Sequence, residues 1–117
     1  MKNVFVRTFG CSANFAEGEM IKGVLAGAGF CIVDSEVFAD VVVLNVCTVK
    51  GYCVALRAVK TACKNLGDKR LVIAGCIPDD FVALIEKIVP NVSFISTHNV
   101  HKIADAVSKC VGGLQVK

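Results

Sequence analysis

The sequence lacks any long apolar run, although it is unusually apolar as a whole. Of its 117 residues 55% are hydrophobic, and the mean hydropathy is +0.64. No stretch reaches the roughly 18 apolar residues of a membrane span, so a buried sheet explains the composition better. The opening MKNVFVRTFG lacks the apolar core and small-residue cleavage site of a signal peptide. We therefore expect a cytoplasmic protein.

Strong charge is also missing. The chain carries 13 basic and 10 acidic residues, and a net charge of +3 is too small to indicate a nucleic-acid surface. Basic residues gather between Lys50 and Arg70, which we interpret as the solvated face of a helix. No repeat, linker or low-complexity segment divides residues 1–117. The sequence predicts one domain.

Several cysteine and glycine motifs are absent. None of the seven cysteines forms a C-x-x-C pair, and no G-x-G-x-x-G occurs. An odd number of cysteines in a reducing compartment argues against a disulfide framework. Core packing, metal ligation and thiol chemistry remain as roles for these side chains.

What the sequence does contain is an alternation of short apolar strands and amphipathic helices. Asn14 is a candidate N-cap with Glu17 three residues later, and Gly29 is expected to end the same helix. The segment 34–39 is short enough for at most one helical turn. The predicted strands are 3–9, 30–33, 40–46, 70–75 and 92–96, and the predicted helices are 14–28, 52–66, 79–89 and 98–111. This order predicts an α/β fold with a doubly wound, mostly parallel five-stranded sheet in the order 2-1-3-4-5.

Three cysteines share one position in this topology. Cys11, Cys47 and Cys76 follow the ends of the first, third and fourth strands, which are neighbours in the predicted order. Their thiols are therefore expected to converge at the carboxyl ends of the strands, where open α/β sheets bind ligands. Gly10 and Gly75 precede two of them, and glycine allows a tight turn and a close approach of other groups.

The remaining cysteines have weaker claims. Cys31 lies in a strand, and Cys63 and Cys110 lie in helices at core spacing, so we interpret all three as packing residues. Cys53, near a helix start, is open to three interpretations: a fourth ligand, a resolving thiol or a packing residue. Three converging thiols fit a disulfide with one thiol over, a zinc site with a fourth ligand, or an iron–sulfur cluster with one open iron.

Three ordered segments give the chain a family resemblance. TFGCSANFAEGEM, ADVVVLNVCTVKG and VIAGCIP resemble the cysteine-bearing segments of the N-terminal domain of radical-SAM methylthiotransferases. The resemblance covers essentially the whole chain. The CTVK after Cys47 and the tail STHNVHKIADAV are most similar to archaeal and eukaryotic members that act on threonylcarbamoyl-adenosine in tRNA.

The resemblance implies a cofactor and a reaction. Cys11, Cys47 and Cys76 would hold an auxiliary [4Fe–4S] cluster whose open iron carries sulfur for C2 of the modified adenosine beside the anticodon. Asn14 and Asn45 would orient loops or hydrogen-bond cluster sulfur, with helix capping and turn support as the alternative roles. Sister enzymes that modify isopentenyl-adenosine or a ribosomal-protein aspartate have a similar N-terminal domain.

The chain also departs from the family. Glu17 and Gly18 replace Asp-Ser, and Val46 replaces the threonine before the second cysteine. The C-x-x-x-C-x-x-C motif, which binds the second [4Fe–4S] cluster and S-adenosylmethionine, is missing, as is a C-terminal RNA-binding domain. We therefore expect a separated N-terminal domain that is inactive alone. Two other functions stay open: a flavodoxin-like flavin or nucleotide module, and a metal-free interaction domain.

Overall fold

The computed structural model describes residues 3–8, 12–47, 52–64, 70–76, 79–88, 92–96 and 102–111. Strands and helices alternate along these segments, as the apolar pattern predicts. In chain order they are β1 (Asn3–Thr8), α1 (Ser12–Gly27), β2 (Cys31–Ile32), the single 3₁₀ turn η1 (Glu36–Phe38), β3 (Val41–Cys47), α2 (Tyr52–Lys64), β4 (Arg70–Cys76), α3 (Asp79–Ile88), β5 (Ser93–Ser96) and α4 (Ile103–Val111).

The five strands form one parallel sheet in the order β2-β1-β3-β4-β5. This confirms the predicted doubly wound α/β fold and its strand order. The chain leaves β1 toward β2 in one direction, and leaves β3 toward β4 and β5 in the other. The switch point of the topology therefore lies between β1 and β3, where such folds bind ligands.

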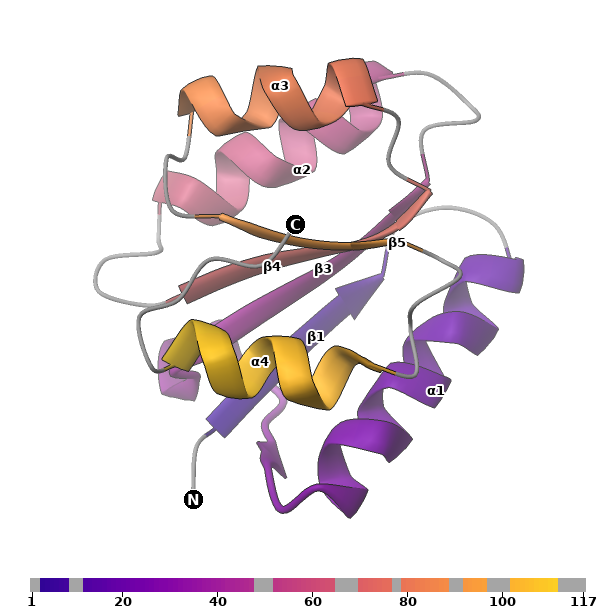
Figure 1. Ribbon diagram of the computed structural model, residues 1–117, viewed down its shortest axis with the longest axis vertical. Coiled ribbons are helices and arrows are strands. Elements are labelled where there is room, and N and C mark those ends of the chain that lie inside the picture. Colours follow the sequence, from indigo (N-terminus) through magenta and orange to yellow (C-terminus); the bar gives the residue numbers. More distant parts are fainter. Residues whose placement is uncertain are drawn as a thin grey trace.

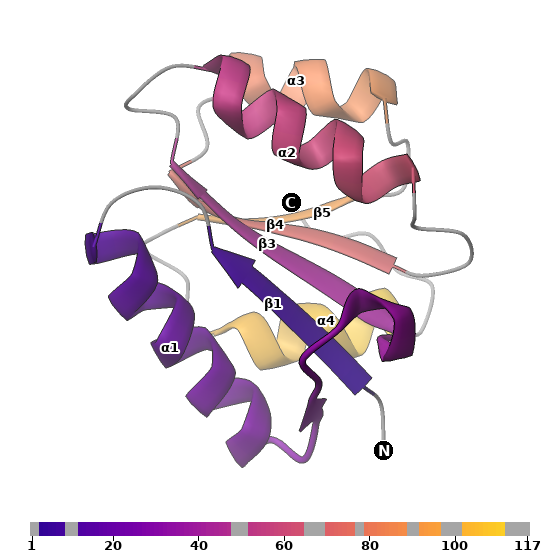
Figure 2. The same ribbon diagram turned by 180° about the vertical axis from the view of Figure 1, so that it is seen from behind.

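Helices cover both faces of the sheet (Figures 1 and 2). α1 and α4 lie on one face, and α2 and α3 lie on the other. Strand β3 is buried on both sides because Val41 and Val43 face α1 and α4, whereas Val42 and Leu44 face α2 and α3. The near-continuous apolar run of this strand is thus the pattern of a central parallel strand, as predicted.

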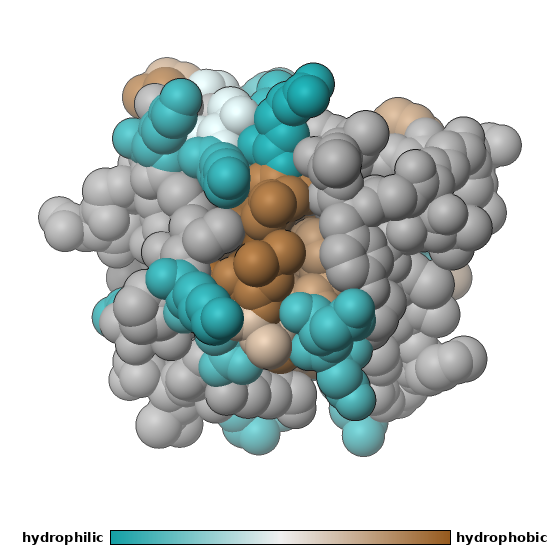
Figure 3. Space-filling model, turned by 90° about the horizontal axis from the view of Figure 1, so that it is seen from above, coloured by the Kyte–Doolittle hydropathy of each residue, from teal (hydrophilic) through white to brown (hydrophobic). Residues whose placement is uncertain are grey.

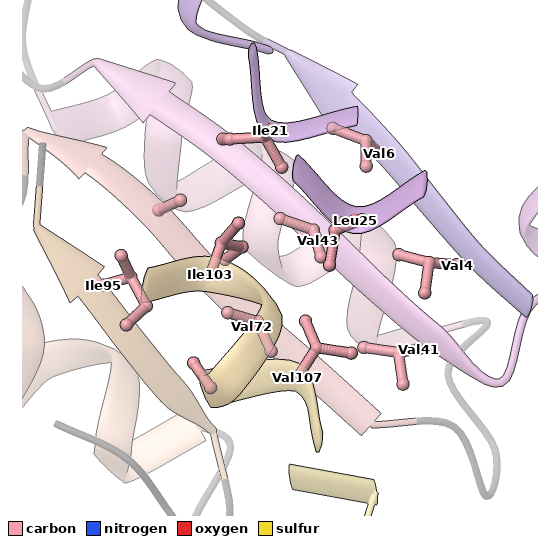
Figure 4. Packing of buried hydrophobic residues seen from close by; sticks show 12 residues of the cluster. Val4, Val6, Ile21, Leu25, Val41, Val43, Val72, Ile95, Ile103 and Val107 are labelled. Atoms are coloured by element: carbon pink, nitrogen blue, oxygen red, sulfur yellow. The ribbon is translucent and has the colours of Figure 1, made fainter. Parts of the chain in front are cut away.

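The core beneath α1 and α4 is made of branched aliphatic side chains (Figure 4). Ile21 and Leu25 from α1 and Ile103 from α4 are fully buried against the valines of the sheet. Each such side chain contributes about 1.5–3 kcal/mol relative to an exposed one. This packing fixes where α1 lies on the sheet.

The prediction for the C-terminal end of α1 is confirmed, and the prediction for its N-terminal end is wrong. Gly29 ends the helix with a φ of +96°. Its N–H donates to the carbonyl oxygen of Ala26, and the N–H of Phe30 donates to the carbonyl oxygen of Leu25, both at 3.1 Å. This is the Schellman arrangement, and the predicted stop is confirmed. The predicted cap at Asn14 is wrong, because α1 already begins at Ser12 and Asn14 is its third residue. Polar side chains fit there since the N–H groups of a first turn have no intrahelical partner.

Other element limits change little. η1 is the one helical turn expected between the second and third strands. β3 and β4 each continue one residue further than predicted, so Cys47 and Cys76 are the last strand residues rather than the residues after them. The predicted helix ends at 65–66 and 98–101 lie outside the described residues.

Asp40 joins the starts of three strands, which we call the amino edge of the sheet. Its carboxylate accepts a hydrogen bond from the N–H of Asn3 at 2.9 Å, and its own N–H donates to Asn3 at 2.8 Å. The N–H of Arg70 donates to the Asp40 carbonyl at 3.1 Å, and the Asn3 amide donates to the carbonyl of Phe38 at 3.0 Å. The strands β1, β3 and β4 are therefore aligned at their first residues.

The outer surface of α2 carries basic side chains. Arg57, Lys60 and Lys64 are exposed, as the prediction of a solvated helix face requires, whereas Lys50 and Lys69 lie outside the described residues. Figure 3 views the α2 and α3 side and shows an apolar strip with hydrophilic side chains along its borders. No helix in the described part of the chain is long and apolar enough to cross a membrane.

Candidate functional site

The candidate site lies where the strands end, at what we call the carboxyl edge of the sheet. The final described residues of β1, β3 and β4 there are Thr8, Cys47 and Cys76. Thr8 pairs with Asn45 across β1 and β3, so β3 reaches two residues beyond β1. This edge contains the topological switch point.

Cys47 and Cys76 are register partners. β3 and β4 pair without interruption from Val41↔Arg70 to Cys47↔Cys76. Neighbouring strands lie about 4.8 Å apart, so the two cysteine backbones stand side by side. The side chains of both residues lie outside the described part of the structure, and the statement concerns their backbones. The register thus places two of the three cysteine backbones next to each other at this edge, and the convergence of the three thiols stays a prediction.

The third predicted ligand, Cys11, lies outside the described residues. Its neighbours are described: β1 ends at Thr8, and α1 begins at Ser12, directly after Cys11 in the chain. Asn14 is on the first turn of α1, and its side chain also lies outside the described part.

Asn45 is a buried polar side chain in the middle of this edge. It has no exposed surface, and its register partners are Thr8 on β1 and Ala74 on β4. By strand alternation it lies on the same face as Val41 and Val43, beneath α1 and α4. Burial of an amide is costly unless its polar atoms find partners, so a buried asparagine sets this position apart from the aliphatic residues on the same face.

Gly75 approaches β3 more closely than any other residue type permits. Its φ is +110°, in the left-handed region that side chains rarely adopt. A Cβ at this position would overlap the carbonyl oxygen of Val46 and lie 2.9 Å from Oδ1 of Asn45. The sequence-based expectation that this glycine allows a close approach is confirmed, whereas Gly10 lies outside the described residues.

A second close approach joins α1 to the end of β1. A Cβ at Gly18 would overlap Oγ1 of Thr8. Gly18 stands where the family segment carries serine, so this departure lets α1 pack directly against the last residue of β1. The sequence pattern showed the glycine but not its neighbour, since the contact joins residues whose pairing depends on the fold.

The other cysteines are dispersed over the fold. Cys31 lies in β2 and is half-buried and free, which is less burial than a packing role predicts. Cys53 and Cys63 lie on α2, and Cys110 lies on α4, with side chains outside the described part. Among the residues that the structure describes, no three metal-ligating side chains form a group.

Sequence reasoning did not single out Phe15. This aromatic side chain lies on the first turn of α1, next to the carboxyl edge, and is 56% exposed. Met20 on the same helix is exposed to a similar extent. Helical periodicity could have predicted this exposure, because both residues fall outside the buried stripe formed by Ile21 and Leu25.

Comparison with known proteins bears on this edge. Residues 3–97 match the model of a family described as "Uncharacterized protein family UPF0004". This range contains all three segments that carry Cys11, Cys47 and Cys76.

The relatives are much longer enzymes. A threonylcarbamoyladenosine tRNA methylthiotransferase from Danio rerio is 30% identical over 119 residues, covering 100% of this chain and 21% of the relative. A ribosomal protein uS12 methylthiotransferase from Acaryochloris marina is 32% identical, covering 98% and 26%. A tRNA-2-methylthio-N(6)-dimethylallyladenosine synthase from Syntrophotalea carbinolica is 29% identical, covering 92% and 26%.

The chain thus spans about a fifth to a quarter of the length of these relatives. The family match covers most of the chain and includes the three cysteine-bearing segments on which the resemblance was based. The chain therefore belongs to the UPF0004 family, the N-terminal domain family of the methylthiotransferases.

Proposed function

We propose that the chain is the auxiliary iron–sulfur domain of a tRNA methylthiotransferase that modifies C2 of N6-threonylcarbamoyladenosine. Cys11, Cys47 and Cys76 would hold a [4Fe–4S] cluster and leave one iron open. The observation that carries this proposal is the in-register pairing of Cys47 and Cys76 at the ends of two parallel strands.

The donor set fits such a cluster. Iron–sulfur clusters are held by cysteine thiolates. Register pairing brings two cysteine backbones to neighbouring positions, and the third cysteine directly precedes the helix that packs on β1. A fourth ligand at this edge is not required, because an open metal position is typical of sites that perform chemistry.

Each part of the chain has a defined role in this proposal. The three thiolates would hold the cluster, and the pairing of β3 with β4 supports this by bringing the backbones of Cys47 and Cys76 to neighbouring positions. When bound, the open iron supplies a position at which sulfur is held for transfer. Asn14 and Asn45 would support the ligand-bearing segments or donate to cluster sulfur. No residue of this chain is assigned as a general acid or base.

The rest of the reaction requires parts outside these 117 residues. S-adenosylmethionine and a second [4Fe–4S] cluster would be bound by a radical-SAM domain that packs on this one, and tRNA would be bound with the help of an RNA-binding domain. The relatives from Danio rerio and Syntrophotalea carbinolica are named for tRNA substrates, which supports tRNA as the partner. The proposal places the enzyme in the cytoplasm, where tRNA is modified and thiols remain reduced.

The experiment is anaerobic reconstitution with iron and sulfide. The wild-type chain is expected to take up a cluster, measured as protein-bound iron, acid-labile sulfide and visible absorbance. The variant Cys11→Ala/Cys47→Ala/Cys76→Ala is expected to take up none while keeping its circular dichroism spectrum.

Cys31→Ala is the matched control. Cys31 lies in β2, which pairs with the first residues of β1, away from the carboxyl edge. This variant should bind as much iron as the wild type. Equal iron in the wild type and in the triple variant would refute the proposal.

A further inference from the structure

We propose that Asn45 and Gly75 form a positioning pair that sets where β4 presents Cys76 relative to Cys47. This inference rests on the proposed function, and it gives Asn45 a specific role, which is to act through the backbone of Gly75. Asn45 lies two residues before Cys47 on β3, and Gly75 directly precedes Cys76 on β4. The pair thus joins the two strands just before their candidate ligands.

The conformation of Gly75 is unusual for its place in the fold. Among the described residues, only Gly29 and Gly75 have a positive φ. Gly29 ends a helix, where a left-handed glycine is common. Gly75 lies inside a strand, where parallel β-structure requires a φ near −120°. The strand therefore turns away from regular geometry one residue before Cys76.

The space around Gly75 is closed by β3. The hydrogen that glycine carries in place of a Cβ points at the carbonyl oxygen of Val46 and at Oδ1 of Asn45. Contacts of this kind between strands are individually weak. Their value here is geometric, since two oxygens of β3 limit where the backbone of residue 75 can lie.

Burial makes Asn45 suited to this role. The side chain has no exposed surface, and its strand lies between Thr8 on β1 and Ala74 on β4. A side chain held on all sides keeps one orientation, so its oxygen gives Gly75 a fixed reference. Metal sites need their ligands held to within about 0.5 Å, and that accuracy depends on the surrounding residues.

The test compares two positioning variants with two matched controls. Gly75→Ala introduces a Cβ into the closed space, and Asn45→Ala removes the buried amide without adding atoms. Gly29→Ala is the control for Gly75→Ala, because it imposes the same left-handed conformation where a Cβ meets nothing within 4 Å. Val43→Ala is the control for Asn45→Ala, because Val43 is fully buried on the same face of β3.

Three properties are measured after anaerobic reconstitution: the half-life of the cluster under an iron chelator, the electron paramagnetic resonance spectrum of the reduced cluster, and thermal unfolding of the metal-free chain. We expect half-lives about 10- to 100-fold shorter, with altered spectra, for Gly75→Ala and Asn45→Ala. Gly29→Ala and Val43→Ala should keep the wild-type spectrum and half-life, although their metal-free forms unfold earlier.

The outcomes separate the two proposals. If Gly75→Ala does not fold, the comparison of Asn45→Ala with Val43→Ala in cluster half-life and spectrum tests the positioning pair by itself. Should the wild type bind a cysteine-dependent cluster and Asn45→Ala match Val43→Ala in half-life and spectrum, the positioning pair is overturned and the proposed function stands. A wild type that binds no such cluster overturns the proposed function and this inference together.

Discussion

The amino and carboxyl edges of the same sheet are built in opposite ways. At the amino edge, the exposed carboxylate of Asp40 and the side chain of Asn3 hold the strand starts through ordinary hydrogen bonds of 2.8–3.1 Å. At the carboxyl edge, a buried amide lies two residues before Cys47, and a left-handed glycine lies directly before Cys76. One edge aligns the strands, and the other departs from regular strand geometry where ligands are expected.

A single segment of the sequence contributes to both edges. ADVVVLNVC carries Asp40, its second residue, at the amino edge and ends with Cys47 at the carboxyl edge, and β3 joins them. Residues of one motif therefore have different roles. The aspartate serves folding, whereas Asn45 and Cys47 belong to the candidate site.

The largest expected effect comes from breaking the core that connects the edges. Leu44 is 1% exposed and packs beneath α2 and α3. Leu44→Ala should cost about 2–5 kcal/mol in the free energy of unfolding, or roughly 8–20 °C in Tm, and both edges should lose protection in hydrogen exchange together. Leu84→Ala is the control, because Leu84 is 36% exposed on α3 and should cost about 0.5 kcal/mol. Equal Tm values for the two variants would contradict the assignment of the core.

A smaller effect is expected at the amino edge. Asp40→Ala removes the carboxylate that accepts the Asn3 N–H at 2.9 Å, at a cost of about 1–2 kcal/mol in the free energy of unfolding. Asp34→Ala, which changes an aspartate in the same connection, should leave stability nearly unchanged. Iron uptake should equal that of the wild type in both variants. Lower iron uptake in Asp40→Ala alone would show that the two edges are not independent.

The smallest expected effect concerns the contact between Gly18 and Thr8. Replacing an exposed helical glycine by alanine adds about 0.5–1 kcal/mol to the free energy of unfolding. Gly23→Ala should stabilise the chain by this amount, because a Cβ there meets nothing within 4 Å. Gly18→Ala should leave the free energy of unfolding near the wild-type value, because its Cβ displaces the Thr8 side chain and this offsets the gain from alanine. In the Thr8→Ala background, Gly18→Ala should regain the full stabilisation. Urea unfolding of the wild type, the two single variants and the double variant measures this. Equal stabilisation at both glycines would contradict the close approach of α1 to β1.

The fold could be predicted from the sequence because its signals are local or periodic. The two-faced run from Val41 to Val46 identified a central parallel strand, and Gly29 identified a helix end. Asn14 misled the prediction because a capping residue is equally compatible with the first turn of a helix that starts earlier.

The site could be predicted only in part. Strand order placed Cys47 and Cys76 at neighbouring strand ends, and their register is now known. The contact of Asn45 with Gly75, and that of Gly18 with Thr8, depend on register and helix position between strands or helices distant in sequence. No pattern within one segment encodes such distances.

The brevity of β2 has a consequence for how the sheet avoids other chains. β2 pairs only with Asn3 and Val4, so the rest of β1 has no strand partner on that side among the described residues. Exposed strand borders recruit foreign strands and aggregate, and charged side chains counteract this. Arg7, exposed and stacked over Phe5 at 5.8 Å, puts a cation on that border. We therefore expect one arginine beside the candidate site to help protect this border of the sheet from pairing with foreign strands.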